Sequence, residues 1–214
     1  MLINLAGRAV PCRFARRRRR TIGITVDAAG VAVAAPLRAP WHEIDGFLRA
    51  KERWIVRKLE EWAKLPRPAV LHGESGESFP LYGMPVTLAR PMPLGRLVAW
   101  LKALALDALE PRAAHFAERL GLPAPRVALS SARTQWGACS EGGAIRLNWR
   151  LVHLDPRLAD YVVAHEVAHL VELNHSSRFW HLLASLYPDW RAARKRLEVA
   201  DAGLPVLRNK KEKT

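Results

Sequence analysis

The stretch Tyr161-Val-Val-Ala-His165-Glu166-Val-Ala-His169-Leu-Val171 decides how this chain is interpreted. In an α-helix, which has ~3.6 residues per turn, side chains four positions apart lie on one face, one turn apart. The imidazoles of His165 and His169 can therefore hold a single divalent ion. Glu166 then lies beside the ion rather than on it, where it can act on a water molecule. The stretch predicts a helix that carries a metal site.

The surroundings of this motif are apolar. Between Tyr161 and Val171 the only strongly polar side chains are the two histidines and the glutamate. A helix that is apolar on all sides is a buried helix, and burying these polar groups without partners costs on the order of several kcal/mol. A bound ion supplies the missing partner. The competing interpretations are a purely structural metal site and a chance occurrence of the five-residue pattern.

A third histidine, His175, follows His169 after a short interval. We expect the motif helix to end at Leu173-Asn174, because asparagine tolerates the left-handed conformation that ends helices. A turn there would bring His175 back toward the metal, and Ser176 or Ser177 would cap the next helix. Three neutral imidazoles leave one coordination position open, as in catalytic zinc sites, and imidazole favours zinc over calcium or magnesium.

Other side chains compete for the place of a ligand. His181 is an alternative to His175, and His153 is expected in a loop. Glu172 shares a helix face with His165, but ~10 Å of helix rise separates them, which is too far for easy sharing of one ion. Cys139 is the candidate for a fourth protein ligand, which would close the site and make it structural.

The catalytic surroundings predict two further features. A second donor to an oxyanion is expected, and its candidates are Tyr161, Arg178 and His181. The pair Asn148-Trp149 ends a predicted strand that either pairs with an extended substrate or packs beneath the motif helix.

Composition limits the class of protein. The chain has 214 residues, of which 50% are hydrophobic and 25% charged, an ordinary globular composition that fits one domain with an extension or two small domains. The two cysteines, Cys12 and Cys139, cannot form a disulfide framework. No secretory signal and no run of ~20 apolar residues is recognisable. We therefore expect a cytoplasmic protein without a membrane partner.

The net charge of +14 predicts attraction to polyanions, of which nucleic acid is the most abundant in a cell. The most concentrated basic segment is Arg16–Arg20, and a second runs from Arg208 to Lys213. The alternative is a solvated strand edge and a frayed terminus in an arginine-rich chain. Nucleic acid is therefore a possible partner through a basic surface.

The order of predicted elements gives an α+β fold. A β-hairpin over 21–26 and 31–35 precedes a helix over 41–64, and a segment rich in Pro, Gly and Ser (66–76) is the best linker. We expect an N-terminal hairpin-and-helix module (1–68), a catalytic domain (69–205) and a disordered basic tail (206–214). In the catalytic domain the sequence predicts a hairpin (78–82 and 86–89), a helix (94–120), a strand (126–130), a loop (136–140), a strand (144–149), and helices from Asp155-Pro156 onward, over 177–187 and over 189–199.

The blocks AHEVAHLVELNHSSRFW (164–180), TQWGACS (134–140) and IRLNWRL (145–151) resemble the YgjP-like family of zinc-dependent metallopeptidases. This family is similar to the SprT and Spartan-type proteases in its catalytic helix pair. The segments RRRRRTIGITVDAAGVAVAAP (16–36) and FLRAKERWIVRKLEEW (47–62) also resemble the family's N-terminal hairpin and helix. Gln135 and Ala138 differ from the form RWGSC that the tryptophan block takes more often.

The resemblance implies a zincin-like domain in which a small sheet packs on the motif helix. It also implies that His165, His169 and His175 bind Zn²⁺ and that Glu166 is the catalytic acid and base. We therefore expect a zinc metallopeptidase that cleaves a protein or peptide substrate. The alternatives are a nucleic-acid-associated binding protein with a structural or vestigial metal site, and a protease that acts on DNA-bound proteins.

Overall fold

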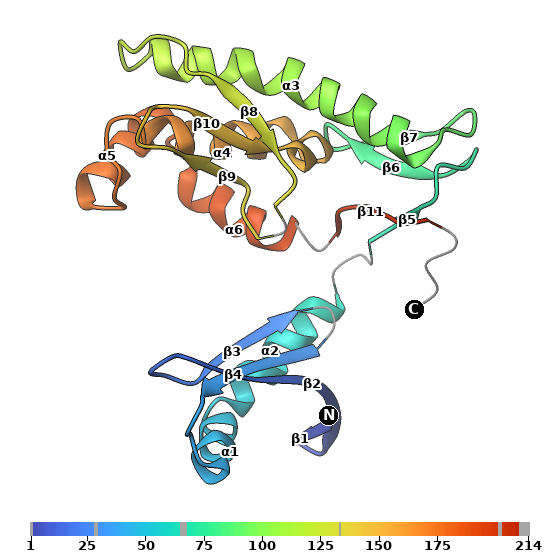
Figure 1. The fold of residues 1–214 in the computed structure, drawn as a ribbon, viewed down its shortest axis with the longest axis vertical. Coiled ribbons are helices and arrows are strands. Elements are labelled where there is room, and N and C mark those ends of the chain that lie inside the picture. Colours follow the sequence, from blue (N-terminus) through green and yellow to red (C-terminus); the bar gives the residue numbers. More distant parts are fainter. Residues whose placement is uncertain (1, 28–29, 65–67, 133, 201–202, 210–214) are drawn as a thin grey trace. The chain divides into compact units, whose positions relative to one another are not determined.

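The chain divides into two compact units, Met1–Arg67 and Pro68–Thr214, one residue away from the predicted boundary. The structure is a computed structural model and describes residues 2–27, 30–64, 68–132, 134–200 and 203–209. Both units mix helices with small sheets, in the α+β class (Figure 1).

The N-terminal unit is built on a four-stranded sheet with the order β1-β2-β4-β3. The predicted hairpin is confirmed, because β3 (Gly23–Asp27) pairs antiparallel with β4 (Gly30–Pro36). The sequence analysis missed β1 (Leu2–Leu5) and β2 (Arg8–Arg17), which form a hairpin of their own. β2 pairs in parallel with β4. The exposed positions of β2 are rich in arginine, so its sequence resembles a charged segment more than a strand with alternating polar and apolar residues.

Two helices cover one face of this sheet. The predicted single helix over 41–64 is divided at Lys51 into α1 (Trp41–Ala50) and α2 (Glu52–Ala63). The backbone N–H of Lys51 donates to the carbonyls of both Phe47 and Leu48, which tightens the end of α1. Ile44, Leu48 and Ile55 pack with Val31 and Val33 in the core of the unit.

The long helix α3 (Leu94–Glu118) runs along one side of the C-terminal unit (Figure 1). Buried residues recur at every fourth position, at Leu97, Leu101, Ala105, Leu109, Ala113 and Ala117, and Phe116 is buried as well. Gly121, with φ of +69°, lies shortly after the end of α3, close to the predicted end at residue 120. This apolar stripe supports the motif helix, because α3 contacts α4 (Pro156–Ala168).

A three-stranded sheet lies next to α4, with the order β8-β10-β9. β10 (Ile145–Asn148) pairs in parallel with β8 (Val127–Ser130) and antiparallel with β9 (Gly137–Cys139). The prediction of a loop over 136–140 was wrong, because residues 137–139 form β9. Of the two alternatives for this strand, pairing with a substrate is excluded, since β8 and β9 occupy both edges of β10 and are themselves the edge strands of the sheet. Trp149 is buried and begins a 3₁₀ helix, η1 (Trp149–His153).

The remaining elements complete the C-terminal unit. The predicted helices are confirmed as α5 (Ser177–Leu186) and α6 (Trp190–Ala200), and both contact α4. The predicted hairpin is confirmed as β6 (Ser78–Leu81) and β7 (Met84–Thr87). β11 (Val206–Leu207) pairs with β5 (Val70–Leu71), so the folded unit continues past the predicted end at residue 205. The rest of the predicted tail, 210–214, lies outside the described residues.

Neither cysteine forms a disulfide; Cys12 is buried and Cys139 is half-buried. None of the helices in the described part of the chain is long and apolar enough to cross a membrane.

Candidate metal centre

The motif helix α4 begins at a strong cap and ends at the histidines. The carboxylate of Asp155 accepts a hydrogen bond of 2.9 Å from the backbone N–H of Arg157, and Pro156 occupies the first turn. Most of the helix is buried, including Glu166 at 6% exposure. His165 and Glu166 lie in its last turn, and His169 is the residue that ends it.

The end of this helix differs from the prediction. α4 stops at Ala168, not at Leu173-Asn174, and Asn174 does not adopt the left-handed conformation: among the described non-glycine residues, positive φ occurs at Ala6 and Tyr82. The chain turns over residues 169–176 instead. The predicted cap is confirmed at Ser176, whose hydroxyl accepts a hydrogen bond of 3.4 Å from Phe179 N–H. The early end leaves enough chain for His175 to return to the helix.

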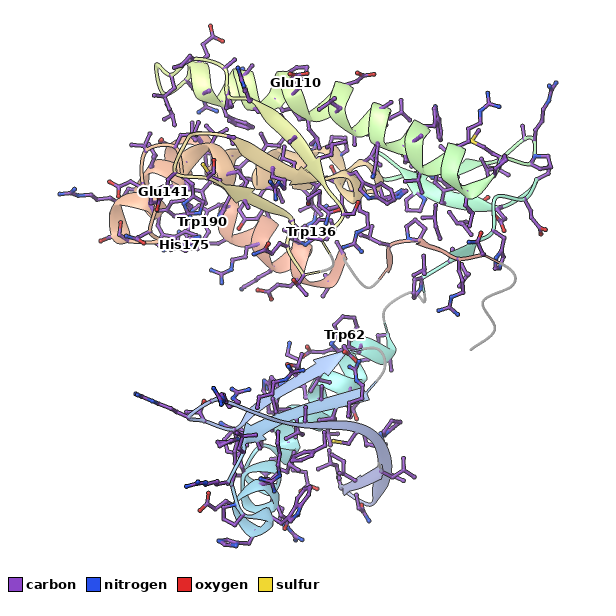
Figure 2. All side chains as sticks on the ribbon, in the orientation of Figure 1. Trp62, Glu110, Trp136, Glu141, His175 and Trp190 are labelled. Atoms are coloured by element: carbon purple, nitrogen blue, oxygen red, sulfur yellow. The ribbon has the colours of Figure 1, made fainter. Side chains whose placement is uncertain are left out.

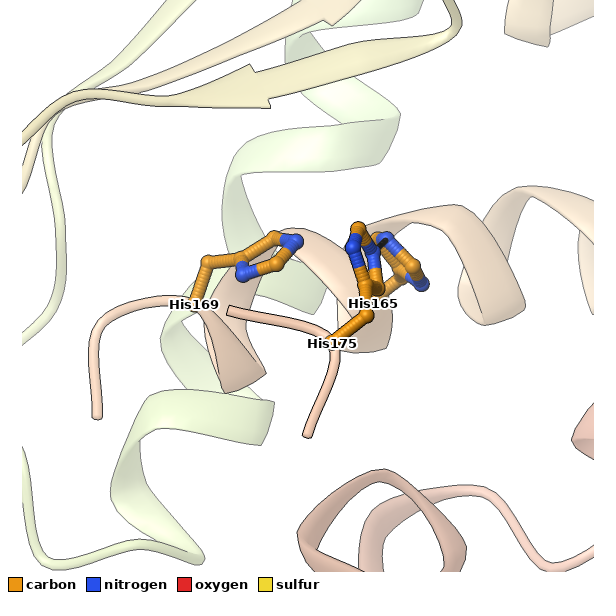
Figure 3. Close-up of side chains that lie close together, drawn as sticks. All are labelled: His165, His169 and His175. Carbon is orange, nitrogen blue, oxygen red and sulfur yellow. Dashed lines mark hydrogen bonds between the residues drawn. The ribbon is translucent and has the colours of Figure 1, made fainter. Parts of the chain in front are cut away.

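The three predicted histidines meet at the C-terminal end of α4 (Figure 3). The Nε2 atoms of His165 and His175 are 3.0 Å apart. One ligand atom from each of His165, His169 and His175 lies within 4.8 Å of the others. Three imidazoles therefore converge on one point from a helix turn and a following loop.

Hydrogen bonds orient one of the rings. His169 Nδ1 is 2.9 Å from the carbonyl oxygen of Glu172, to which it donates as Nδ1–H. This tautomer leaves His169 Nε2 with its lone pair free, the form in which imidazole binds a metal. Glu172 thus contributes its backbone to the site, and its carboxylate is not part of the cluster.

The surroundings disfavour the charged form of two of the imidazoles. Burial, together with the neighbouring His169, His175 and Arg194, lowers the pKa of His165 to about 3. Burial also lowers the pKa of His175, together with His169 and Arg194. The buried Nδ1 of His165 has no hydrogen-bond partner among the described residues. Nε2 of the core residue His153 is buried in the same way, so the feature that makes His165 a candidate ligand is its other nitrogen, Nε2, which faces His175 Nε2 at 3.0 Å.

An aromatic cluster supports the imidazoles from α5 and α6. The fully buried Phe179 lies with its ring centroid 4.5 to 4.9 Å from all three imidazoles. Trp180 stacks on His175 at 5.4 Å and on Trp190 at 4.4 Å, and its Nε1–H donates to the His175 carbonyl at 3.1 Å. His175 and Trp190 lie on the same side of the unit in Figure 2. These rings fix the imidazoles by packing.

Glu166 lies against the edge strand β9. A Cβ placed on Gly137 would lie 2.5 Å from Glu166 Oε1, so the absence of a side chain at 137 makes room for the carboxylate. Burial raises the pKa of Glu166 to about 7, which is the range in which a carboxyl exchanges protons near neutral pH. Sequence reasoning did not single out Gly137. The sequence signal for Gly137 was its place directly after Trp136 in the TQWGACS block, but the need for a glycine follows only from the packing of β9 against Glu166.

Several predicted alternatives lie outside the cluster. Cys139 and His181 are not members of the three-histidine group among the described residues. Burial and the charge of Glu166 raise the pKa of the Cys139 thiol, which disfavours the thiolate that a metal needs. His181 Nδ1 lies 2.8 Å from the Ser177 carbonyl oxygen on its own helix. His153 is not in a loop as expected but is buried in η1, with Nδ1 2.6 Å from the Pro80 carbonyl oxygen.

The candidates for an oxyanion donor occupy different environments. Tyr161 is buried with its ring centroid 6.1 Å from that of His165, and burial raises the pKa of its hydroxyl, which remains a proton donor at neutral pH. Arg178 is exposed in the first turn of α5. The sequence analysis missed Arg194, which lies 5.6 Å from the Trp180 ring centroid and acts electrostatically on His165 and His175. Its signal was the four-residue spacing from Trp190 on a predicted helix.

The donor set fits a zinc ion. Zn–N bonds of ~2.0–2.1 Å in tetrahedral geometry put two nitrogens about 3.3 Å apart, close to the 3.0 Å between the Nε2 atoms of His165 and His175. Three neutral imidazoles form a set that suits zinc and leaves one position for water or substrate. In the described ranges no carboxylate or thiol joins the three histidines.

Comparison with known proteins gives a family match over most of the chain. Residues 20–91 and 92–200 match the family model described as YgjP-like, metallopeptidase domain. Among solved structures, the crystal structure of the metallopeptidase zymogen of Pyrococcus abyssi abylysin is similar, with 24% sequence identity and a TM-score of 0.41. The similarity covers 46% of this chain and 99% of that one. No curated protein sequence matches significantly.

Proposed function

Because this chain belongs to the YgjP-like metallopeptidase family, we propose that it is a zinc-dependent peptidase with its catalytic centre at the end of α4. In this proposal His165, His169 and His175 hold the ion and Glu166 is the general base. The observation that carries the proposal is the convergence of the three imidazoles beside a buried carboxylate.

The donor set favours a catalytic over a structural ion. Structural zinc is closed by four protein ligands, whereas catalytic zinc has three and an open position. Cys139, the candidate for a fourth ligand, is absent from the described cluster. A structural site also has no use for a buried carboxylate such as Glu166 next to its ligands.

The chain's own residues account for the proton transfers. When bound, zinc supplies Lewis acidity that polarises a carbonyl and makes water acidic near neutral pH. Glu166 accepts a proton from the attacking water on its carboxylate and passes that proton to the leaving amine nitrogen. The apolar packing around Glu166 keeps this proton on the carboxyl between the two steps.

Two residues are candidates for the hydrogen-bond donor to the developing oxyanion, Tyr161 and Arg194. Tyr161 approaches the site from one turn before His165, and Arg194 approaches it from α6 across Trp180. Removal of one oxyanion donor lowers kcat by roughly 100- to 1000-fold. Tyr161→Phe and Arg194→Gln therefore distinguish them: the true donor loses kcat, while KM stays within about twofold.

The neighbouring edge strand fits an extended peptide. β9 has one neighbour, β10, and Gly137 of β9 lies against Glu166. An unpaired strand edge can accept a peptide through backbone hydrogen bonds. We infer that the substrate pairs with β9 and that its backbone then lies next to the carboxylate of Glu166. This arrangement, a small sheet next to the motif helix, supports a zincin-like fold for the C-terminal unit, with residues 1–67 as an additional module.

The test compares Glu166→Gln with Glu172→Gln in the full-length protein. We expect about one zinc per chain in both variants and in the wild type, measured by plasma mass spectrometry. Cleavage of an unfolded protein and of a peptide library should be lost in Glu166→Gln and retained in Glu172→Gln, because the Glu172 carboxylate is outside the cluster. Equal cleavage by wild type and Glu166→Gln would refute the peptidase proposal.

The second candidate is a nucleic-acid-associated binding protein whose metal is structural or vestigial. The net charge of +14 favours it. It predicts that wild type and Glu166→Gln bind nucleic acid equally and that neither cleaves protein. A protease for DNA-bound proteins would instead show Glu166-dependent cleavage that increases when DNA is present.

A further inference from the structure

The positive charge of this chain is concentrated in its N-terminal unit. Residues 1–67 contain 15 Lys and Arg against six Asp and Glu, a net charge of +9 out of the +14 of the whole chain. The three histidines of the metal centre belong to the other unit. The basic residues of the N-terminal unit therefore call for an explanation separate from the peptidase chemistry.

The sheet of this unit has one covered face and one open face. Side chains alternate along a strand, so Val31, Val33 and Ala35 point into the core formed with α1 and α2. The alternate positions face away from the helices. On this second face, residues that pair across β2, β4 and β3 form two rows. One row consists of Arg13, Ala32 and Thr25, and the other of Ala15, Ala34 and Gly23, so all members except Arg13 are small.

A shallow groove of about 560 Å³ lies on the open face. Its floor consists of alanine, glycine and threonine residues, and Arg13, Arg17 and Arg19 line it. Arg19 extends over the sheet, since a Cβ on Gly23 would lie 2.6 Å from its guanidinium. Arg13 is ion-paired with Asp27. Arg17 and Arg19 are exposed and form no ion pair within the described ranges.

The groove lacks the means to stack bases. Phe14 belongs to a strand that lines the groove, but the alternation of side chains directs its ring to the opposite face of the sheet. There its ring centroid lies 4.7 Å from that of Trp41. Proteins that bind single strands place aromatic rings along a basic groove. Here small side chains allow a close approach, and unpaired guanidinium groups offer phosphate contacts without base recognition.

We propose that this groove binds the phosphate backbone of double-stranded nucleic acid, independently of sequence. Arg17 and Arg19 contact phosphates, and the floor of Ala15, Ala34 and Gly23 lets the backbone lie against the sheet. Charge complementarity carries the proposal, because the open face holds free cations and the ligand is a polyanion. The site is distinct from the metal centre and its occupancy requires no peptidase activity.

The experiment measures binding of a fluorescent 30-base-pair DNA duplex to the full chain by anisotropy between 50 and 200 mM salt. Arg17→Gln/Arg19→Gln should weaken binding about tenfold at low salt and reduce the slope of log K against log salt by about two. The control, Arg53→Gln/Arg57→Gln, removes the same charge from exposed positions on α2 outside the groove and should change affinity less than threefold. Ala34→Glu, which puts a carboxylate on the groove floor, should weaken binding at least as much as the double variant, with thermal unfolding measured to verify the fold.

The outcomes separate this proposal from the peptidase proposal. Glu166→Gln should bind the duplex as the wild type does, whether or not it cleaves protein. Three results overturn the inference: no duplex binding by the wild type, equal losses in the groove and α2 variants, or tighter binding of a single strand than of the duplex.

Discussion

Gly137 of β9 and Glu166 of α4 are in direct contact, with no room for a methyl group between them. A Cβ on residue 137 would lie 2.5 Å from both Cγ and Oε1 of Glu166 and 2.6 Å from its Cδ. Contacts below 3 Å require one partner to shift, and this part of Glu166 is held in a buried environment. This strand therefore determines where the carboxylate lies, and with it the place of the proposed general base next to the three imidazoles.

The first prediction concerns this contact. Gly137→Ala should displace the Glu166 carboxylate and lower kcat about 100-fold, because misplacement of a catalytic group by ~1 Å has an effect of that size. Zinc content should remain unchanged. Gly142→Ala is the matched control in the same region, since its Cβ would meet only Ser140 Oγ at 4.0 Å. Equal activities of the two variants would contradict the positional role of Gly137.

The second prediction tests which histidines hold the metal. His175→Ala leaves two imidazoles, so zinc should be lost on dialysis against a weak chelator, whereas His181→Ala should retain about one ion per chain. The metal content is read by plasma mass spectrometry, and binding of Co²⁺ by its visible spectrum gives the coordination number. Loss of zinc from His181→Ala with retention in His175→Ala would show that His181, and not His175, is the third ligand.

The third prediction concerns Asn148, which organises the loop before β9. Its side chain is fully buried, and Nδ2 donates to the carbonyls of Ala132 at 2.7 Å and Gln135 at 2.9 Å. Asn148→Ala leaves these acceptors unsatisfied, and the free energy of unfolding should fall by about 3 kcal/mol. Gln135→Ala, which retains the backbone carbonyl at an exposed position, should change it by less than about 0.5 kcal/mol. Urea unfolding measures both.

The fourth prediction concerns the pH dependence of stability through Asp155. The backbone N–H of Arg157 and, more weakly, the guanidinium of Arg196 lower the pKa of this carboxyl, against the opposing effect of its desolvation. A pKa below the unfolded value of ~3.9 gives stability that is complete above that value and is lost as pH falls through the folded pKa. Asp155→Asn can still cap α4 but has no charge to titrate.

The measurement is the free energy of unfolding in urea from pH 7 down to the acid limit of folding. The difference between wild type and Asp155→Asn should be constant above about pH 5 and should decrease below about pH 4. Asp189→Asn, in the turn before α6, is the control for removal of a carboxylate from the same region. A difference that grows toward acid would show that the pKa of Asp155 is raised rather than lowered.

The elements that sequence periodicity predicted are those that form their own local pattern. The β3–β4 hairpin, α3, α5 and α6 were predicted within a few residues, because their alternation or helical spacing is complete within the segment. β2 and β9 were missed. β2 is stabilised as a strand by pairing with β1 and β4, and β9 by pairing with β10. The partners that stabilise these strands therefore lie outside the segments themselves.

The same division applies to the candidate site. His165, Glu166 and His169 followed from helical spacing, which is a local property of the sequence. The return of His175 was also predicted, but for the wrong reason, since α4 ends five residues earlier than expected and Asn174 adopts no left-handed turn. Gly137, Phe179 and Arg194 come from three different elements, and their importance depends on how those elements pack around the end of α4.

By itself the sequence determined the kind of chemistry that we propose, because the identity and spacing of the three proposed ligands depend on one turn of helix and a short following segment. Tertiary structure decided everything that requires a distant partner. The room for Glu166 beside Gly137, the exclusion of Cys139 and His181 from the cluster, and the arginine-lined open face of the N-terminal sheet all arise from contacts between segments far apart in sequence. Local propensity specifies where a side chain points along its own element, and only packing specifies what it meets.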